Sequence, residues 1–102
     1  MSDYLADVRR YDPAAGEDVV AKIVSHLGIA LRNRDSSLVS CSDENELDRV
    51  RQSWCAKKLG VEGEEAHATV MAVCQDMKDD RAKSRVTFYY LVAQKLGKLD
   101  TV

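Results

Sequence analysis

Three helical stretches of the sequence end at the same dipeptide, Leu-Gly. These ends fall at Leu27-Gly28, Leu59-Gly60 and Leu96-Gly97. A His or Lys residue precedes each dipeptide, where positive charge interacts favourably with the negative end of the helix dipole. Glycine also adopts the left-handed conformation that closes the last turn of a helix. The three dipeptides therefore predict an architecture of several short helices.

Apolar residues recur at helical spacing in five segments. The expected helices are a short leading one that begins after the cap Ser2, and then 12–27, 43–58, 62–77 and 84–96. Asp12-Pro13 is typical of a helix start, although Gly16 leaves that start open by a few residues. Asp43 and Glu46 have the spacing of a capping box, and Ser84 is the expected cap of the last helix. We expect an all-α fold in which residues 1–102 form a single domain, a bundle of four main helices plus a short N-terminal helix.

The last expected helix is apolar around most of its circumference. One side carries Val86, Tyr89, Tyr90, Ala93 and Leu96, and the apolar surface is extended by Phe88, Leu91 and Val92. Such a helix is normally central in its bundle, and a face left uncovered is a candidate contact for another subunit. We expect the face of Tyr89, Tyr90, Ala93 and Leu96 to pack against Val19, Ile23, Leu47, Trp54, Val70 and Val73. Phe88, Leu91 and Val92 form the hypothetical interface of a homodimer.

The composition and net charge of the chain speak against some classes of function. With 102 residues, of which 45% are hydrophobic and 31% charged, the chain suits one domain with a modest core. A net charge of -2 speaks against a wholly basic nucleic-acid-binding surface, although local basic clusters keep nucleic acid open as a ligand. The first residues lack the pattern of a signal peptide, and no apolar run is long enough to span a membrane. We therefore expect a cytoplasmic protein without a membrane partner.

The three cysteines, Cys41, Cys55 and Cys74, show no C-x-x-C spacing. Their odd number predicts neither a complete disulfide framework nor a zinc ribbon, and reduced thiols are the simpler interpretation. Cys41 precedes the expected helix at 43–58, a position that makes a thiol more reactive. Cys41 is thus a candidate reactive thiol, with a structural thiol as the alternative, and Cys55 and Cys74 are expected in the core.

Two basic segments form the main candidate binding site. Residues 29–42 make a connection too long for a plain helix link, and residues 81–85 place positive charge at a helix start, where the dipole disfavours it. If the connection folds beside that helix, backbone amides and side chains would create an anion site. Its expected residues are Arg32, Arg34, Ser36, Ser37, Arg81, Lys83, Ser84 and Arg85. The structural alternative is a solvated, internally paired run of charges.

No residue pattern of an enzyme is found in the sequence. Paired carboxylates, a nucleophile elbow, a P-loop and G-x-G-x-x-G are all missing, so no catalytic residue and no cofactor are predicted. His26 is interpreted as a helix-end residue and His67 as a surface residue. Because a metal site would have to gather them from separate helices, no metal is predicted.

Two stretches of the sequence resemble one known family. They are residues 26–43, from His26-Leu27-Gly28 to Asp43, and residues 80–91, which read Asp80-Arg81-Ala82-Lys83-Ser84-Arg85-Val86-Thr87-Phe88-Tyr89-Tyr90-Leu91. Both are similar to the small bacterial proteins of domain-of-unknown-function family 2853. The resemblance implies a small, helical, bacterial protein. It implies no activity and no site residue.

Three functions follow in order of preference. The first is a non-enzymatic module that binds an unidentified protein or another partner. The alternative is a binder of a small anion, a nucleotide or nucleic acid that uses the clusters near Arg32 and Arg34 and near Arg81 and Arg85. The third is a thiol-dependent activity at Cys41.

Overall fold

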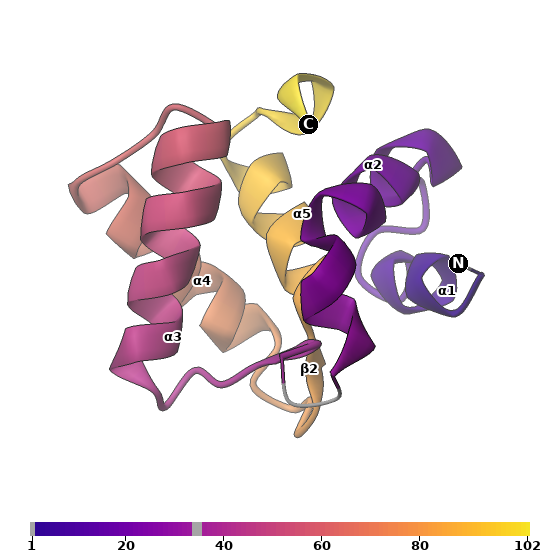
Figure 1. The fold of residues 1–102 in the computed structure, drawn as a ribbon, viewed down its shortest axis with the longest axis horizontal. Helices are drawn as coiled ribbons and strands as arrows, with labels where there is room; N and C mark the ends of the chain where they lie inside the picture. The colour runs from indigo at the N-terminus through magenta and orange to yellow at the C-terminus, as the bar shows by residue number, and fades with distance from the viewer. Residues whose placement is uncertain (1, 34–35) are drawn as a thin grey trace.

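The computed structural model describes residues 2–33 and 36–102 and shows a mostly helical chain (Figure 1). Its α-helices are α1 (Ser2–Arg9), α2 (Glu17–Leu27), α3 (Glu44–Arg49), α4 (Glu64–Asp76) and α5 (Arg85–Lys95). Helix α3 continues directly as the π-helix η2 (Val50–Lys58), and two 3-10 helices follow α2 and α5 as η1 (Gly28–Arg32) and η3 (Leu99–Thr101). The strands are β1 (Leu38–Val39) and β2 (Lys83–Ser84). The prediction of a mostly helical fold is confirmed, whereas the strand pair was not predicted.

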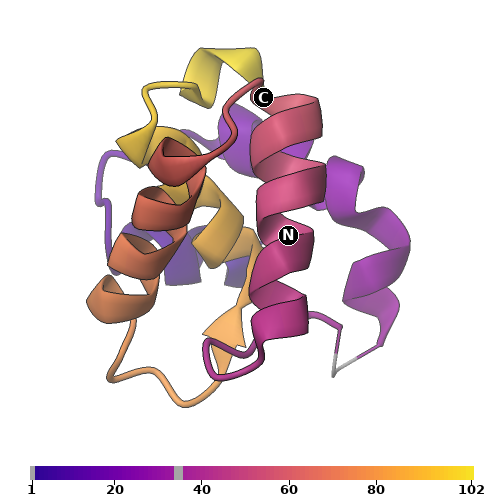
Figure 2. The same cartoon turned by 90° about the vertical axis from the view of Figure 1, so that its left-hand side faces the viewer.

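Helix α5 lies in the middle of the molecule, with the other helices packed around it (Figures 1 and 2). Every residue from Arg85 to Ala93 is buried. The central position agrees with a helix that is apolar on nearly all sides. The homodimer interface expected at Phe88, Leu91 and Val92 has to be corrected, because these side chains are at most 4% exposed. They are covered by the chain itself and offer no surface to a partner.

The core around α5 contains most of the residues predicted for it. Buried members of that set are Ile23, Leu47, Trp54, Val70, Val73, Tyr89, Tyr90 and Ala93, while Val19 and Leu96 are half-buried. The indole N–H of Trp54 donates a hydrogen bond to the backbone carbonyl of Tyr89 at 3.0 Å, and the two rings are in contact. This bond satisfies the one polar atom of a fully buried Trp and fixes η2 against α5.

The three Leu-Gly dipeptides do end helices, as predicted. Gly28, Gly60 and Gly97 have positive φ values of 39°, 72° and 69°. The chain leaves η2 through a wide turn, in which the N–H of Leu59 donates to the carbonyl of Trp54 and the N–H of Val61 donates to that of Cys55. An L-residue with a side chain is strained at such φ values, which explains why glycine stands at these ends.

Of the starts left open for α2, the one at Asp12-Pro13 is not used, and the helix begins after Gly16. The carboxylate of Asp12 accepts hydrogen bonds from Tyr90 Oη at 2.7 Å and from Gln94 Nε2 at 2.8 Å. Burial, together with the bond to Asp12, raises the pKa of Tyr90 to about 12. The segment before α2 is therefore tied to α5, and the helix begins only at Glu17.

The long connection after α2 folds beside the start of α5. Its first part forms η1, and β1 then pairs antiparallel with β2, with Leu38 opposite Ser84 and Val39 opposite Lys83. Figure 2 shows the chain that enters α3 beside the chain that leads from α4 into β2. The two basic segments of the sequence are thus neighbours in space.

Candidate functional site

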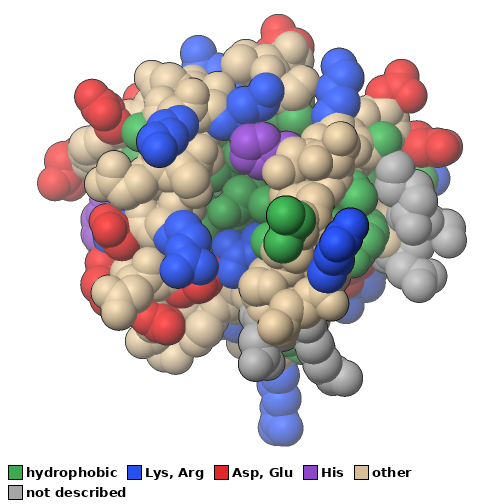
Figure 3. Space-filling view, viewed as in Figure 1, with side chains coloured by type: hydrophobic (Ala, Val, Ile, Leu, Met, Phe, Trp, Pro, Cys, Tyr) green, Lys and Arg blue, Asp and Glu red, His purple; other side chains and the backbone are tan. Residues whose placement is uncertain are grey.

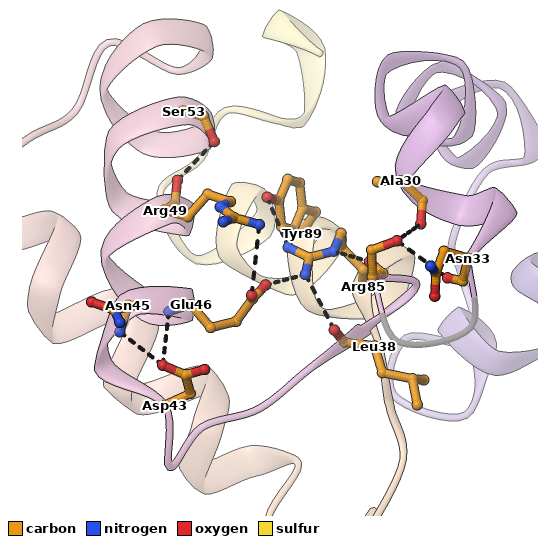
Figure 4. Close-up of polar contacts among 11 residues, drawn as sticks. Ala30, Asn33, Leu38, Asp43, Asn45, Glu46, Arg49, Ser53, Arg85 and Tyr89 are labelled. Carbon is orange, nitrogen blue, oxygen red and sulfur yellow. Dashed lines mark hydrogen bonds and ion pairs between the residues drawn. The ribbon is translucent and has the colours of Figure 1, made fainter.

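Arg85 was predicted as part of an open anion site, but its side chain points into the protein. Its side chain is only 3% exposed. The guanidinium donates to the carbonyls of Ser36 at 2.5 Å and Leu38 at 3.2 Å and to Tyr89 Oη at 3.3 Å, and it forms an ion pair with Glu46 (Figure 4). Arg85 therefore holds the long connection and α3 against α5. Its place in an open anion site is a prediction that the structure corrects.

Three other residues of the predicted site, all of them serines, have surroundings different from those expected. Ser36 Oγ donates to a backbone carbonyl of η1 at 2.6 Å, and the carbonyl of Ser37 accepts a hydrogen bond from the Arg85 N–H at 2.8 Å. Ser84 Oγ is buried and has no hydrogen-bond partner among the described residues, so the expected cap is missing. Arg32 is exposed at the end of η1. Arg34 lies outside the described residues.

The Glu46 side chain does not make the expected helix cap. Asp43 does cap α3 and accepts hydrogen bonds from the N–H groups of Asn45 at 3.0 Å and Glu46 at 3.4 Å. The Glu46 carboxylate binds Arg85 instead of closing the capping box. A buried cation forms a stronger bond with a carboxylate than an exposed backbone N–H does.

A disulfide joins Cys41, just before α3, to Cys74 on α4. The two Cα atoms are 5.9 Å apart, and 33 positions separate the residues in sequence. Cys41 is half-buried and Cys74 is 9% exposed. The expectation of reduced thiols is wrong for this pair, and Cys41 is not a free reactive thiol in this state. Disulfide pairing needs two chain segments side by side, which spacing alone does not show.

Beside this disulfide lies an open pocket of about 570 Å³, which we call the basic pocket. It is lined by Leu38, Val39, Ser40, Cys41, Ser42, Cys74, Lys78, Arg81 and Lys83. Arg81 and Lys83 were predicted as site residues. Lys78, Ser40 and Ser42 were missed, although the charged link 78–83 and the serine-rich connection contain them. The sequence shows that these two segments are rich in basic and hydroxyl side chains. It does not show which segments pair as strands in the fold.

The cations of the basic pocket form no ion pair with a carboxylate among the described residues. Among the described residues that line the pocket, none is acidic. Lys83 Nζ donates to the backbone carbonyl of Asp80 at 2.8 Å. The Asp80 carboxylate instead accepts hydrogen bonds from Tyr11 and Arg10, and its pKa is lowered by these bonds and by the charges of Arg10 and nearby Lys83. The basic pocket is therefore a concentrated positive site beside a disulfide.

This concentration is local. On the face drawn in Figure 3, acidic and basic side chains are interspersed, and apolar side chains are visible in the gaps between them. The formal net charge of the whole chain is -2. Positive potential therefore gathers at particular places such as the basic pocket and does not extend over the whole molecule.

The remaining candidates are less suited to a site. A second pocket of about 390 Å³ contains Arg51 and His67, but Arg51 is already paired with Glu44 at 2.6 Å. The ring of His26 packs on Trp54, and its pKa is lowered by burial and by nearby Lys58. Within residues 2–33 and 36–102, no cluster of three His, Cys, Asp or Glu residues is arranged to hold a metal ion. No helix in this part of the chain has the length and apolar character of a membrane span.

The third cysteine, Cys55, provides a direct check of the disulfide. Its side chain is fully buried, and burial raises the pKa of the thiol to about 11. We expect a thiol reagent to find no reactive group in native oxidised protein, one per chain after unfolding and three after unfolding with a reductant. Mass spectrometry after alkylation counts these groups. Three thiols before reduction would contradict the pairing of Cys41 with Cys74.

Comparison with known proteins gives a family match. A family model described as "Protein of unknown function (DUF2853)" matches residues 3–100, which is nearly the whole chain. No curated protein matches the chain. The match confirms the resemblance seen in residues 26–43 and 80–91, and its description names no activity.

Proposed function

The chain belongs to the family of proteins of unknown function DUF2853, and we propose that it is a binding module for a small anion, which it holds in the basic pocket. The observation that carries this proposal is the convergence of Lys78, Arg81 and Lys83 on one pocket without an acidic residue in its described lining. Cations that lack carboxylate partners attract anions, most strongly in a concave site with a low-dielectric wall. Leu38 and Val39 supply such a wall.

Hydrogen-bonding groups accompany the charges. Ser40 Oγ and Ser42 Oγ line the pocket and share a hydrogen bond of 3.1 Å, so the hydroxyl that accepts in this bond keeps its own O–H to donate to an anion. Arg81 offers a planar fork of donors that matches a carboxylate or a phosphate group. A pocket of about 570 Å³ has the size of a small-molecule site. These features favour a small carboxylate or phosphate ligand over an extended nucleic acid.

Titration with inorganic phosphate tests the proposal. We expect amide NMR shifts at residues 40–42 and 78–83, which saturate with phosphate and weaken as salt is added. Lys78→Gln combined with Arg81→Gln should weaken binding by about tenfold or more, because two charged hydrogen bonds are lost. The exposed pair Lys57→Gln and Lys58→Gln changes the charge by the same amount away from the pocket and serves as the control.

Three results would contradict anion binding in the basic pocket. They are an absence of saturable shifts, shifts centred outside residues 40–42 and 78–83, and equal weakening by the control pair. A parallel titration with a short oligonucleotide compares ligand classes. If the oligonucleotide produces broad shifts over many elements while phosphate has no effect, the ligand is nucleic acid and the small-anion proposal is wrong.

A further inference from the structure

The basic pocket contains a second chemical feature, the Cys41–Cys74 disulfide. Both cysteines line the same pocket as Lys78, Arg81 and Lys83. Most disulfides that only staple a fold have no special need for a cationic cavity around them. Cys55, by contrast, lies in the core with no exposed surface. The pocket therefore offers a small molecule access to this disulfide and not to the third cysteine.

We propose that the basic pocket is a site of thiol–disulfide exchange, in which a small thiol that carries carboxylate groups reacts with the Cys41–Cys74 disulfide. This inference rests on the proposed anion binding and names the ligand class. The carboxylate would contact Lys78 and Arg81, and the sulfur of the thiol would face the disulfide. The expected partner is a small molecule, because the pocket has the volume of a small-molecule site.

The exchange balances in two steps. The thiolate of the small molecule attacks the sulfur of Cys41, the more exposed residue of the pair, so that a mixed disulfide forms and the Cys41–Cys74 bond breaks. The electron pair of that bond leaves with Cys74 as a thiolate. A second small thiolate then attacks the mixed disulfide, releases Cys41 as a thiolate and leaves as an oxidised dimer of the small thiol. Two small thiols are oxidised, and one protein disulfide is reduced.

The cations of the pocket favour this exchange in two ways. They raise the local concentration of a negatively charged thiol. They also stabilise the leaving thiolate of Cys74, which lines the same pocket as Lys78, and a thiol leaves faster when its thiolate is stabilised. The same residues neither attract a cationic thiol nor orient it toward the disulfide. The sign of charge on the small thiol should therefore control the rate.

Three small thiols of different charge test the proposal on the full oxidised chain. They are 3-mercaptopropionate, uncharged 2-mercaptoethanol and cationic cysteamine. Each rate constant is measured by acid quenching, alkylation and mass spectrometry, and is divided by the rate of the same thiol with an uncharged model disulfide. This division removes the differences in intrinsic reactivity. We expect 3-mercaptopropionate to exceed cysteamine by about tenfold at low ionic strength, and the preference to fade at about 1 M salt.

Two sets of variants identify the residues responsible. Lys78→Gln with Arg81→Gln should reduce the charge preference severalfold, whereas Lys57→Gln with Lys58→Gln should keep it. Cys74→Ser and Cys41→Ser each leave one pocket cysteine. With 3,3′-dithiodipropionate as the probe, we expect the mixed disulfide to form several times faster at Cys41 in the first variant than at Cys74 in the second.

The proposal is overturned if the three normalised rates are equal, or if the preference survives Lys78→Gln with Arg81→Gln. It is also overturned if reduction becomes independent of thiol concentration, because the disulfide would then open only when the chain unfolds. The phosphate titration separates this failure from that of anion binding. Saturable phosphate binding without a charge preference in exchange removes the exchange alone, and failure of both measurements removes both proposals.

Discussion

Replacing Arg85 with Met should lower the free energy of unfolding by about 3–5 kcal/mol. The buried guanidinium pairs with Glu46, whose side chain is 16% exposed, and donates to two backbone carbonyls of the connection. Methionine fills much of the space but leaves the carboxylate without its cation and the carbonyls without a donor. Removing one member of a buried ion pair costs more than the pair itself contributes, because the remaining charge stays desolvated. Urea unfolding of both proteins measures the difference.

The control variant for Arg85→Met is at a position four residues earlier in the sequence. Arg81 is exposed, so Arg81→Met should change stability by about 0.5 kcal/mol or less. Adding Glu46→Leu to Arg85→Met should restore part of the loss, because no unpaired carboxylate then remains. If Arg85→Met and Arg81→Met destabilise the protein equally, the buried network does not hold the connection.

Helix ends could be predicted from the sequence because they depend on local chemistry. A left-handed glycine such as Gly28 or Gly60 needs only its own backbone and the preceding turn. The same holds for Asp43, whose carboxylate caps the adjacent N–H groups. These elements keep the same interactions whatever packs around them.

Helix starts were less predictable where long-range partners compete. Asp12 has the sequence context of a cap, and its carboxylate does accept from the N–H of Ala14, but its other oxygen accepts from Tyr90 and Gln94 on α5 and no helix begins there. Glu46 is likewise taken from its cap by Arg85. Both competing partners lie far along the chain, and a local pattern carries no information about them. For Glu46, the folded core decides between a cap and a distant bond.

The location of the candidate site could be predicted from the sequence. Only some of the side chains that line it could be. The basic segments were expected to meet where the long connection reaches the start of α5, and β1 with β2 brings them together. The sequence shows which side chains are charged but not which of them are buried. Arg85 is therefore buried outside the pocket, whereas Lys78, which was not predicted, lines it. Likewise, Cys41 and Cys74 became a pair only through the packing of α4 against the connection.

Reducing the Cys41–Cys74 disulfide should lower the free energy of unfolding by about 3–4 kcal/mol. The bond closes a loop between residues separated by 33 positions, so its loss gives the unfolded chain many more conformations. The reduced protein keeps the core around α5, and we therefore expect it to remain folded with a lower denaturation midpoint. Urea unfolding with and without dithiothreitol measures the change.

A disulfide-free variant separates this effect from other actions of the reductant. In Cys41→Ser with Cys74→Ser, dithiothreitol should leave the midpoint unchanged, and the variant should resemble the reduced parent chain to within about 1 kcal/mol. Cys55 is present in both proteins and is therefore held constant. An equal effect of dithiothreitol on both proteins would contradict a stabilising disulfide. A large effect on the parent alone means that reduction of this bond changes the stability of the whole chain, because the bond ties α4 to the connection.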